Sequence, residues 1–337
     1  MAARTIRNLQ FSAVLLLALA GQPGPGLFRN PTARTLLLPQ LVDQTLAVYY
    51  RDAHPYVNWT VKQLTEALPE LKGLEPAASQ DALPEILRKT GANVEAFFRD
   101  FVNTTSLEEI HEVAPRRVIN VNDGDIPQST NQKFYYLTLA DWKGGGLRTL
   151  HEYRTDLQGN PVQNDGAPPG FMLTRGFASL EVYLHPSHQA ESTFRLLGRE
   201  WTNGKQCQVV VFAQRPGWTA GMSDFTAGSM SFPILEQGIV WIDPADYQIL
   251  RMRTDLLAPQ PQIELQRSTS DIQFSSVHFK ESNLTLWLPS EVDVEVEYRR
   301  ETFRNRHRYS DYRLFNVTTD EVHHLIHPAP QDSDNPR

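Results

Sequence analysis

The sequence predicts an α+β fold in which a helical segment at residues 36–112 precedes a large curved antiparallel sheet at residues 114–318, with a helix covering the sheet. Three observations lead to this prediction. Apolar residues recur at three- and four-residue spacings up to about residue 110, which is the spacing of one helical face. Beyond that point the apolar period is two, as in a half-buried strand. Turn signals then separate the strand candidates at distances that suit hairpins.

The first twenty residues have the layout of a secretory signal peptide. Arg4 and Arg7 precede an apolar run from Phe11 to Ala20, and a run of about ten residues is too short to cross a hydrocarbon layer of roughly 30 Å. We therefore expect cleavage after Ala20, the alternative being an N-terminal anchor that stays in place. Residues 21–34 are rich in glycine and proline and predict a flexible leader.

The rest of the chain predicts an exported protein, periplasmic or secreted. No later apolar run approaches the roughly 20 residues of a membrane-spanning helix, so we expect no transmembrane span after cleavage. Cleavage removes two arginines and no acid, which changes the net charge from −7 to −9. Such a surface repels phosphate backbones, and no nucleic acid partner is expected. Cys207 is the one cysteine, so an intrachain disulfide is excluded.

Two sets of apolar residues predict helices between residues 36 and 112. The first set is Leu38, Leu41, Val42, Leu46 and Tyr49, and the second is Val94, Phe97, Phe98 and Phe101. Each set lies on one face of a helix. Pro39, Pro69 and Pro84 divide the segment, because proline removes a backbone donor and clashes with the preceding turn. We expect three or four short helices.

The clearest strand is at residues 291–298, where acidic and apolar residues alternate. The alternation places Val292, Val294 and Val296 on one buried face. Other strand candidates are residues 134–140, 147–156, 193–201, 206–213, 238–243, 248–255, 272–279, 284–288 and 306–316. Together they predict a meander of about nine or ten antiparallel strands, with a tail at residues 319–337.

A helical spacing returns between the early strands and predicts a helix that covers one face of the sheet. Its apolar residues are Leu173, Phe177, Leu180, Tyr183 and Leu184. A curved sheet with a helix across it makes an apolar cleft, which suits a lipid or an acylated protein. The candidate ligand-binding residues are Trp241, Trp287, Val292, Val294, Val296, Phe177 and Leu180. Each of them could equally be ordinary core.

Residues 240–244, Val-Trp-Ile-Asp-Pro, and residues 247–252, Tyr-Gln-Ile-Leu-Arg-Met, have the form of a strand, an Asp-Pro turn and a second strand. This resembles the outer-membrane lipoprotein-sorting proteins, the LolA/LolB-like half-barrels, over roughly residues 130–315. The resemblance implies an unclosed antiparallel sheet around an apolar cavity, with helices as a lid. Segments 82–87, 97–101, 152–156 and 305–315 look like uncharacterised secreted proteins of acidobacteria-like soil bacteria, a likeness that implies no activity.

Catalytic and metal-binding motifs are missing from the sequence. It contains no nucleophile elbow, phosphate-binding glycine loop or paired-cysteine metal motif. His323, His324 and His327 are interpreted as a solvated cluster, and Cys207 as a small packed side chain. We therefore predict no catalytic residues, no metal and no cofactor. A hydrolase is the alternative if folding joins distant His, Asp or Glu side chains in one cleft.

Arginines 299, 300, 304, 306 and 308 are the one basic concentration. We expect them to pair with nearby acidic residues, the alternative being contact with anionic lipid headgroups. Two functions of different classes then fit the chain. The first is a non-enzymatic exported bacterial envelope protein that binds a lipid or another apolar ligand in the cleft. The second is a protein-interaction scaffold of an envelope complex, in which the N-terminal helices dock a partner and no small ligand binds.

Overall fold

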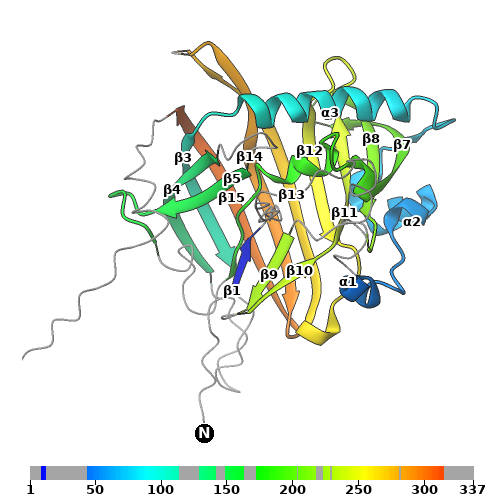
Figure 1. Cartoon of the computed structure of the whole chain (residues 1–337), viewed down its shortest axis with the longest axis horizontal. Coiled ribbons are helices and arrows are strands. Elements are labelled where there is room, and N and C mark those ends of the chain that lie inside the picture. Colours follow the sequence, from blue (N-terminus) through cyan, green and yellow to red (C-terminus); the bar gives the residue numbers. More distant parts are fainter. Residues whose placement is uncertain are drawn as a thin grey trace, which may run out of the picture.

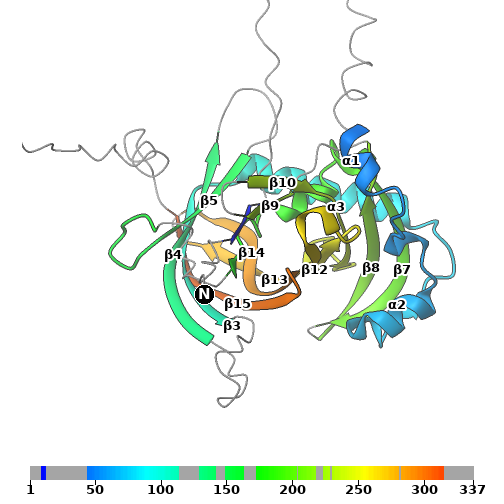
Figure 2. The ribbon, with the colours of Figure 1, turned by 90° about the horizontal axis from the view of Figure 1, so that it is seen from below.

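A large antiparallel sheet of eleven strands dominates the structure, a computed structural model (Figure 1). The structure describes residues 9–12, 44–113, 129–141, 149–162, 172–202, 204–217, 223–227, 230–280 and 282–314. Among the described strands, the sheet ends at β2 on one side and at β5 on the other, so it stays open. Figure 2 shows that it is strongly curved. The predicted α+β fold with a half-barrel-like antiparallel sheet is confirmed.

The strands of the large sheet follow the chain as hairpins over most of its width. In spatial order they are β2 (Glu75–Pro76), β7 (Ser192–Thr202), β8 (Lys205–Gln214), β11 (Glu236–Ile242), β12 (Ile249–Leu256), β13 (Leu265–Phe279), β14 (Leu284–Tyr298), β15 (Glu301–Leu314), β3 (Thr104–Val113), β4 (Ser129–Asp141) and β5 (Thr149–Thr155). The strand β3 pairs with the last strand, β15, and this pairing joins the N-terminal and C-terminal parts of the sheet.

A second sheet lies on the concave side of the first (Figure 2). Its order is β10 (Met230–Ile234), β9 (Ser223–Ala227), β1 (Leu9–Ser12) and β6 (Met172–Leu173). The strand β1 falls inside the predicted signal peptide; the remainder of residues 1–34, and the histidines of the tail, lie outside the described residues. Neither β9 nor β10 was among the strand candidates.

Helices cover both faces of the large sheet. They are α1 (Gln44–Tyr49), α2 (Val61–Ala67) and α3 (Leu83–Asp100), with short 3₁₀ turns η2 (Tyr56–Asn58), η3 (Pro69–Leu71), η5 (Leu180–Leu184), η6 (Gln189–Glu191) and η7 (Pro261–Ile263). Proline in the first turn starts α3, and Val94, Phe97 and Phe98 on one face of it are buried. Figure 1 shows α3 crossing the strands near one end of the sheet. No helix among the described residues is long and apolar enough to span a membrane.

Two expectations about local structure are wrong. The helical segment ends at Asp100, and Thr104–Val113 within it is the strand β3. The buried side of β3 is mostly polar, so the apolar period could not reveal a strand there. The covering helix expected from residue 173 is instead β6, an irregular stretch and the 3₁₀ turn η5. All five residues of η5 are buried, so this segment has no solvent-facing side that would make it an amphipathic helix.

The large sheet separates two apolar clusters. The concave-face cluster lies between the sheet, α3 and residues 172–184, which we call the cover segment. The convex-face cluster lies between the other face and residues 50–71, with Leu64, Leu68 and Leu71 at its centre. In β11, Val240 belongs to the concave-face cluster and its neighbour Trp241 to the convex-face cluster, as alternation along a strand requires.

Candidate functional site

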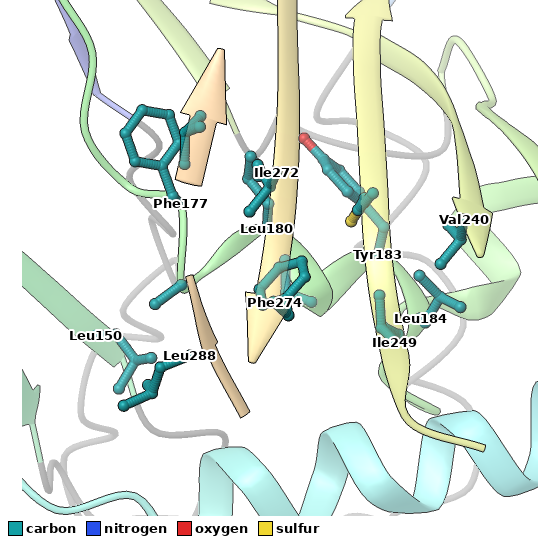
Figure 3. Close-up of a cluster of buried hydrophobic side chains, with 14 of the residues drawn as sticks. Leu150, Phe177, Leu180, Tyr183, Leu184, Val240, Ile249, Ile272, Phe274 and Leu288 are labelled. Atoms are coloured by element: carbon teal, nitrogen blue, oxygen red, sulfur yellow. The ribbon is translucent and has the colours of Figure 1, made fainter. Parts of the chain in front are cut away.

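The concave face of β14, with Ile272 and Phe274 of the neighbouring β13, is apolar and lies under the cover segment. Val292, Val294 and Val296 on β14 are at most 4 % exposed. Figure 3 shows Leu180 of the cover segment next to Ile272 and Phe274 of β13, with Phe177 to one side, and all four side chains belong to the concave-face cluster. The site is therefore a covered apolar surface whose cover comes from a segment outside the large sheet.

The structure brings five of the seven predicted ligand-binding residues together. Val292, Val294, Val296, Phe177 and Leu180 all belong to the concave-face cluster. Whether they contact a ligand stays a prediction.

The two tryptophans differ from these five residues. Trp241 lies in the convex-face cluster, where its Nε1 donates to Glu200 Oε2 at 2.7 Å and the Arg251 guanidinium stacks 4.5 Å from its ring centre. Trp287 is half-buried and packs against both clusters. Trp241 therefore cannot line the same cleft as the valines.

Two buried glutamates hold the cover segment in place, one at its middle and one near its end. Glu152 on β5 accepts hydrogen bonds from Gly176 N and Ser179 Oγ, each at 3.0 Å. Glu236 on β11 accepts from Tyr183 Oη of the cover segment, and from Ser223 Oγ of β9 at 2.7 Å. Burial raises the pKa of both carboxyls. The cover segment is thus fixed by a few specific bonds as well as by apolar packing.

A fully buried polar group lies beside the apolar surface, at the start of the cover segment. Arg154 on β5 donates to Glu108 on β3 through Nε at 2.6 Å and Nη2 at 2.9 Å. The same carboxylate accepts from His307 Nδ1 at 2.9 Å and Tyr309 Oη at 2.8 Å, both on β15. Burial by itself raises the pKa of Glu108. The charge and hydrogen bonds of Arg154, together with the interaction with His307, outweigh the effect of burial and lower the pKa of Glu108 to about 2. We call these four residues the buried polar cluster.

Several polar atoms around this cluster have no hydrogen-bond partner among the described residues. They are Arg154 Nη1, His307 Nε2, Asn305 Oδ1, Thr174 Oγ1 and Glu112 Oε2. Each such buried group costs about 1–3 kcal/mol if it stays unpaired. Sequence reasoning missed this cluster, because its members sit on strands whose buried faces are polar and so carry no apolar alternation.

Folding does join a histidine to a glutamate, which is the condition set for a hydrolase. In the part of the chain that the structure describes, however, no hydroxyl or thiol contacts His307 Nε2. Cys207 lies in the convex-face cluster, fully buried, and burial raises the pKa of its thiol to about 11. The interpretation of Cys207 as a packed side chain is confirmed, and the His307–Glu108 pair has no described nucleophile to activate.

The convex face of β12 to β15 is charged, and its arginines are paired. Arg304 contacts Glu295 at 2.8 Å, Arg306 contacts Asp293 at 2.6 Å and Arg308 contacts Glu291 at 2.8 Å. The predicted pairing is confirmed for these three arginines and for Arg299, which contacts Glu264 at 2.8 Å; for Arg300 it stays a prediction. A groove of about 520 Å³ on this face is lined largely by charged side chains. Its chemistry does not suit an apolar ligand.

The fold and site together define an open antiparallel half-barrel with a covered apolar concave face. No protein-family model matches the chain, and no curated protein matches it. Three solved structures are similar to it, each over nearly the whole of its own length. The first is a DUF1329 family protein from Desulfovibrio piger, with a TM-score of 0.40 and 12 % identity, covering 73 % of this chain and 98 % of that chain. The second is a putative outer membrane lipoprotein-sorting protein domain from Vibrio parahaemolyticus, with a TM-score of 0.36 and 11 % identity, covering 72 % of this chain and 96 % of that chain. The third is a LolA superfamily protein from Nitrosomonas europaea, with a TM-score of 0.33 and 10 % identity, covering 73 % of this chain and 97 % of that chain.

The second and third of these structures carry the family description that the sequence resembles. At 10–12 % identity the likeness concerns the fold alone. The resemblance to acidobacteria-like secreted proteins stays a prediction.

Proposed function

We propose that this chain is a non-enzymatic exported envelope protein that binds an apolar ligand, a lipid or an acylated protein, on the concave face of its sheet. The observation that carries the proposal is that the cover segment is held outside the strand pairing of the large sheet. The cover segment is not a strand of the large sheet, and among the described strands β6 pairs only with β1. An acyl chain that displaced Phe177 and Leu180 would find the apolar surface of β14, extended by Ile272 and Phe274 of β13, beneath them.

The energies favour such an exchange. Burying one methylene contributes about 0.8 kcal/mol, so an acyl chain of about fourteen methylenes contributes on the order of 11 kcal/mol. Exposing Phe177 and Leu180 costs about 1.5–3 kcal/mol each. The difference leaves room for the cost of ordering the ligand and for the bonds that Glu152 and Glu236 make to the cover segment.

Native mass spectrometry of the protein from a bacterial envelope fraction, followed by lipid extraction, tests the proposal. We expect lipid at stoichiometric occupancy. Leu180→Ala weakens the closed cover, so after partial delipidation it should retain more lipid than the wild type. Leu68→Ala is the matched control, because Leu68 is equally buried but lies in the convex-face cluster. Lipid-free protein in all three preparations would contradict the proposal.

One observation favours the scaffold as a second candidate. Val48 and Tyr49 of α1 are 58 % and 49 % exposed, and exposed apolar side chains on a helix suit a protein partner. Chemical crosslinking in intact envelopes, comparing wild type with a Val48→Ser, Tyr49→Ser double variant, tests it. The scaffold predicts a defined crosslinked species that the double variant loses while the protein stays lipid-free.

A further inference from the structure

The concave face changes from apolar to polar between two adjacent strands. In the β14–β15 register, Val292 pairs with His307 and Val294 pairs with Asn305. Paired residues lie on the same face of an antiparallel sheet, and all four side chains are at most 5 % exposed. A molecule bound over the valines therefore meets the unpaired polar atoms of β15 at its own edge.

The contacts decide which of these atoms accept and which donate. The Glu108 carboxylate, with its low pKa, only accepts, so His307 Nδ1 carries the proton and Nε2 is left as an acceptor. Asn305 Nδ2 donates to Met172 O, which leaves Asn305 Oδ1 as a second acceptor. Arg154 Nη1 is a donor without a partner among the described residues. The site offers two acceptors and one donor.

The charges of the buried polar cluster and of the neighbouring Glu112 cancel. The Arg154 guanidinium and the Glu108 carboxylate form one ion pair, and both side chains are fully buried. Burial lowers the pKa of His307 despite the opposing effect of Glu108, and burial raises the pKa of Glu112 to about 8. At neutral pH these groups therefore carry no net charge that could balance an ionised ligand. An uncompensated charge is costly inside a protein, so a neutral polar group fits best.

We propose that the ligand is a neutral amphiphile whose polar end carries both a hydrogen-bond donor and an acceptor, and that this end binds His307 Nε2, Asn305 Oδ1 and Arg154 Nη1. Hydroxyl and amide groups meet this requirement, as in an acylglycerol or an N-acylated amide, whereas a phosphate or a free carboxylate does not. This inference rests on the proposed function, since it names the chemistry of the ligand that the concave face binds. The acyl chain extends from the polar end over Val292 and Val294.

Three probes with the same sixteen-carbon acyl chain test the ligand chemistry on the intact mature protein. They are 1-monopalmitoylglycerol, which has donors and acceptors, methyl palmitate, which only accepts, and palmitate, which is an anion. Competition between them, read by native mass spectrometry, should favour monopalmitoylglycerol by about tenfold over methyl palmitate, because the ester leaves both protein acceptors unpaired. We expect palmitate to bind more weakly than monopalmitoylglycerol.

The outcomes separate this inference from the proposed function. If none of the probes binds, both fail. If all three bind within twofold of one another, the concave face binds acyl chains but the unpaired atoms hold only water, and the inference is overturned. Tighter binding of palmitate also overturns it.

Variants locate the preference at β15. His307→Asn keeps an amide donor toward Glu108 and removes the acceptor at Nε2, so the tenfold preference for monopalmitoylglycerol should fall close to unity. His111→Asn is the control, because His111 is on the opposite face of β3 and contacts Asn131. Circular dichroism checks that the variants fold. If His307→Asn does not fold, Asn305→Leu takes its place, because it removes the second acceptor, Asn305 Oδ1. An unchanged preference in the folded variant overturns the inference.

Discussion

Replacing Arg154 with methionine removes the cation that keeps Glu108 ionised inside the protein. Both side chains are fully buried, and the guanidinium donates twice to Glu108 and once to the Thr174 carbonyl oxygen. Removing one partner of a buried ion pair costs about 3–5 kcal/mol, because the other charge stays buried without compensation. We expect the free energy of unfolding of Arg154→Met at pH 7 to fall by this amount.

The same pair gives the protein a pH dependence in acid. Burial opposes ionisation of Glu108, yet Arg154 brings its pKa down from 4.5 to about 2. A carboxyl with a lowered native pKa stabilises the fold above its unfolded pKa, and this contribution is lost as the pH falls through the native pKa. Glu108 should therefore contribute about 3 kcal/mol above pH 4.5, lost progressively toward pH 2. In Arg154→Met this loss should be absent.

Urea unfolding followed by circular dichroism, at pH 7 and in steps down to pH 2.5, measures both effects. Arg304→Met is the control, because its ion pair with Glu295 is exposed and such pairs contribute about 1 kcal/mol or less. The reasoning is refuted if Arg154→Met is no less stable than Arg304→Met. It is also refuted if Arg154→Met keeps the wild-type loss of stability between pH 4.5 and pH 2.5.

Three further predictions concern stability. Burial raises the pKa of Glu112 and of Glu181 to about 8, so both carboxyls destabilise the fold progressively as the pH rises from 4.5 to 8. In a Glu112→Gln, Glu181→Gln double variant, the free energy of unfolding measured with urea should therefore fall less over this pH range than in the wild type. Gly198→Ala should lower the unfolding temperature and Gly73→Ala should not, because φ at Gly198 is 148° and a Cβ there would lie 1.9 Å from Glu75 O. Trp241→Phe should cost about 1–2 kcal/mol through its lost hydrogen bond and leave lipid occupancy unchanged, as measured by urea unfolding and native mass spectrometry.

The sequence predicts best those elements that have one buried face and one solvated face. In β14, Val292, Val294 and Val296 are buried while Asp293 is exposed, so the alternation marks both the strand and its inner side. The helix α3 is equally clear, because its buried residues follow the helical spacing. The alternation at residues 291–298 thus predicts the inner face of β14, although β14 is one strand from Leu284 to Tyr298 and not the two candidates at 284–288 and 291–298.

Elements that are buried on both sides give no such signal. Every residue of β11 is buried, because the concave-face and convex-face clusters lie on either side of it. Trp241 and Val240 are both apolar and both buried, so nothing in the sequence says which of them faces the concave side. The 3₁₀ turn η5 of the cover segment has the same property, so its apolar spacing predicts an amphipathic helix that the structure does not contain.

The buried polar cluster depends on contacts between residues far apart in the chain. Glu108 and Arg154 are separated by 46 residues, and Glu108 and His307 by 199. On its own strand each is a polar residue that local patterning assigns to solvent, and it becomes a buried group only when β3 pairs with β15. The pairing of β3 with β15 forms only when the N-terminal and C-terminal parts of the sheet assemble. The polar end of the proposed ligand site is therefore a product of topology, whereas its apolar end can be read from the valines of β14.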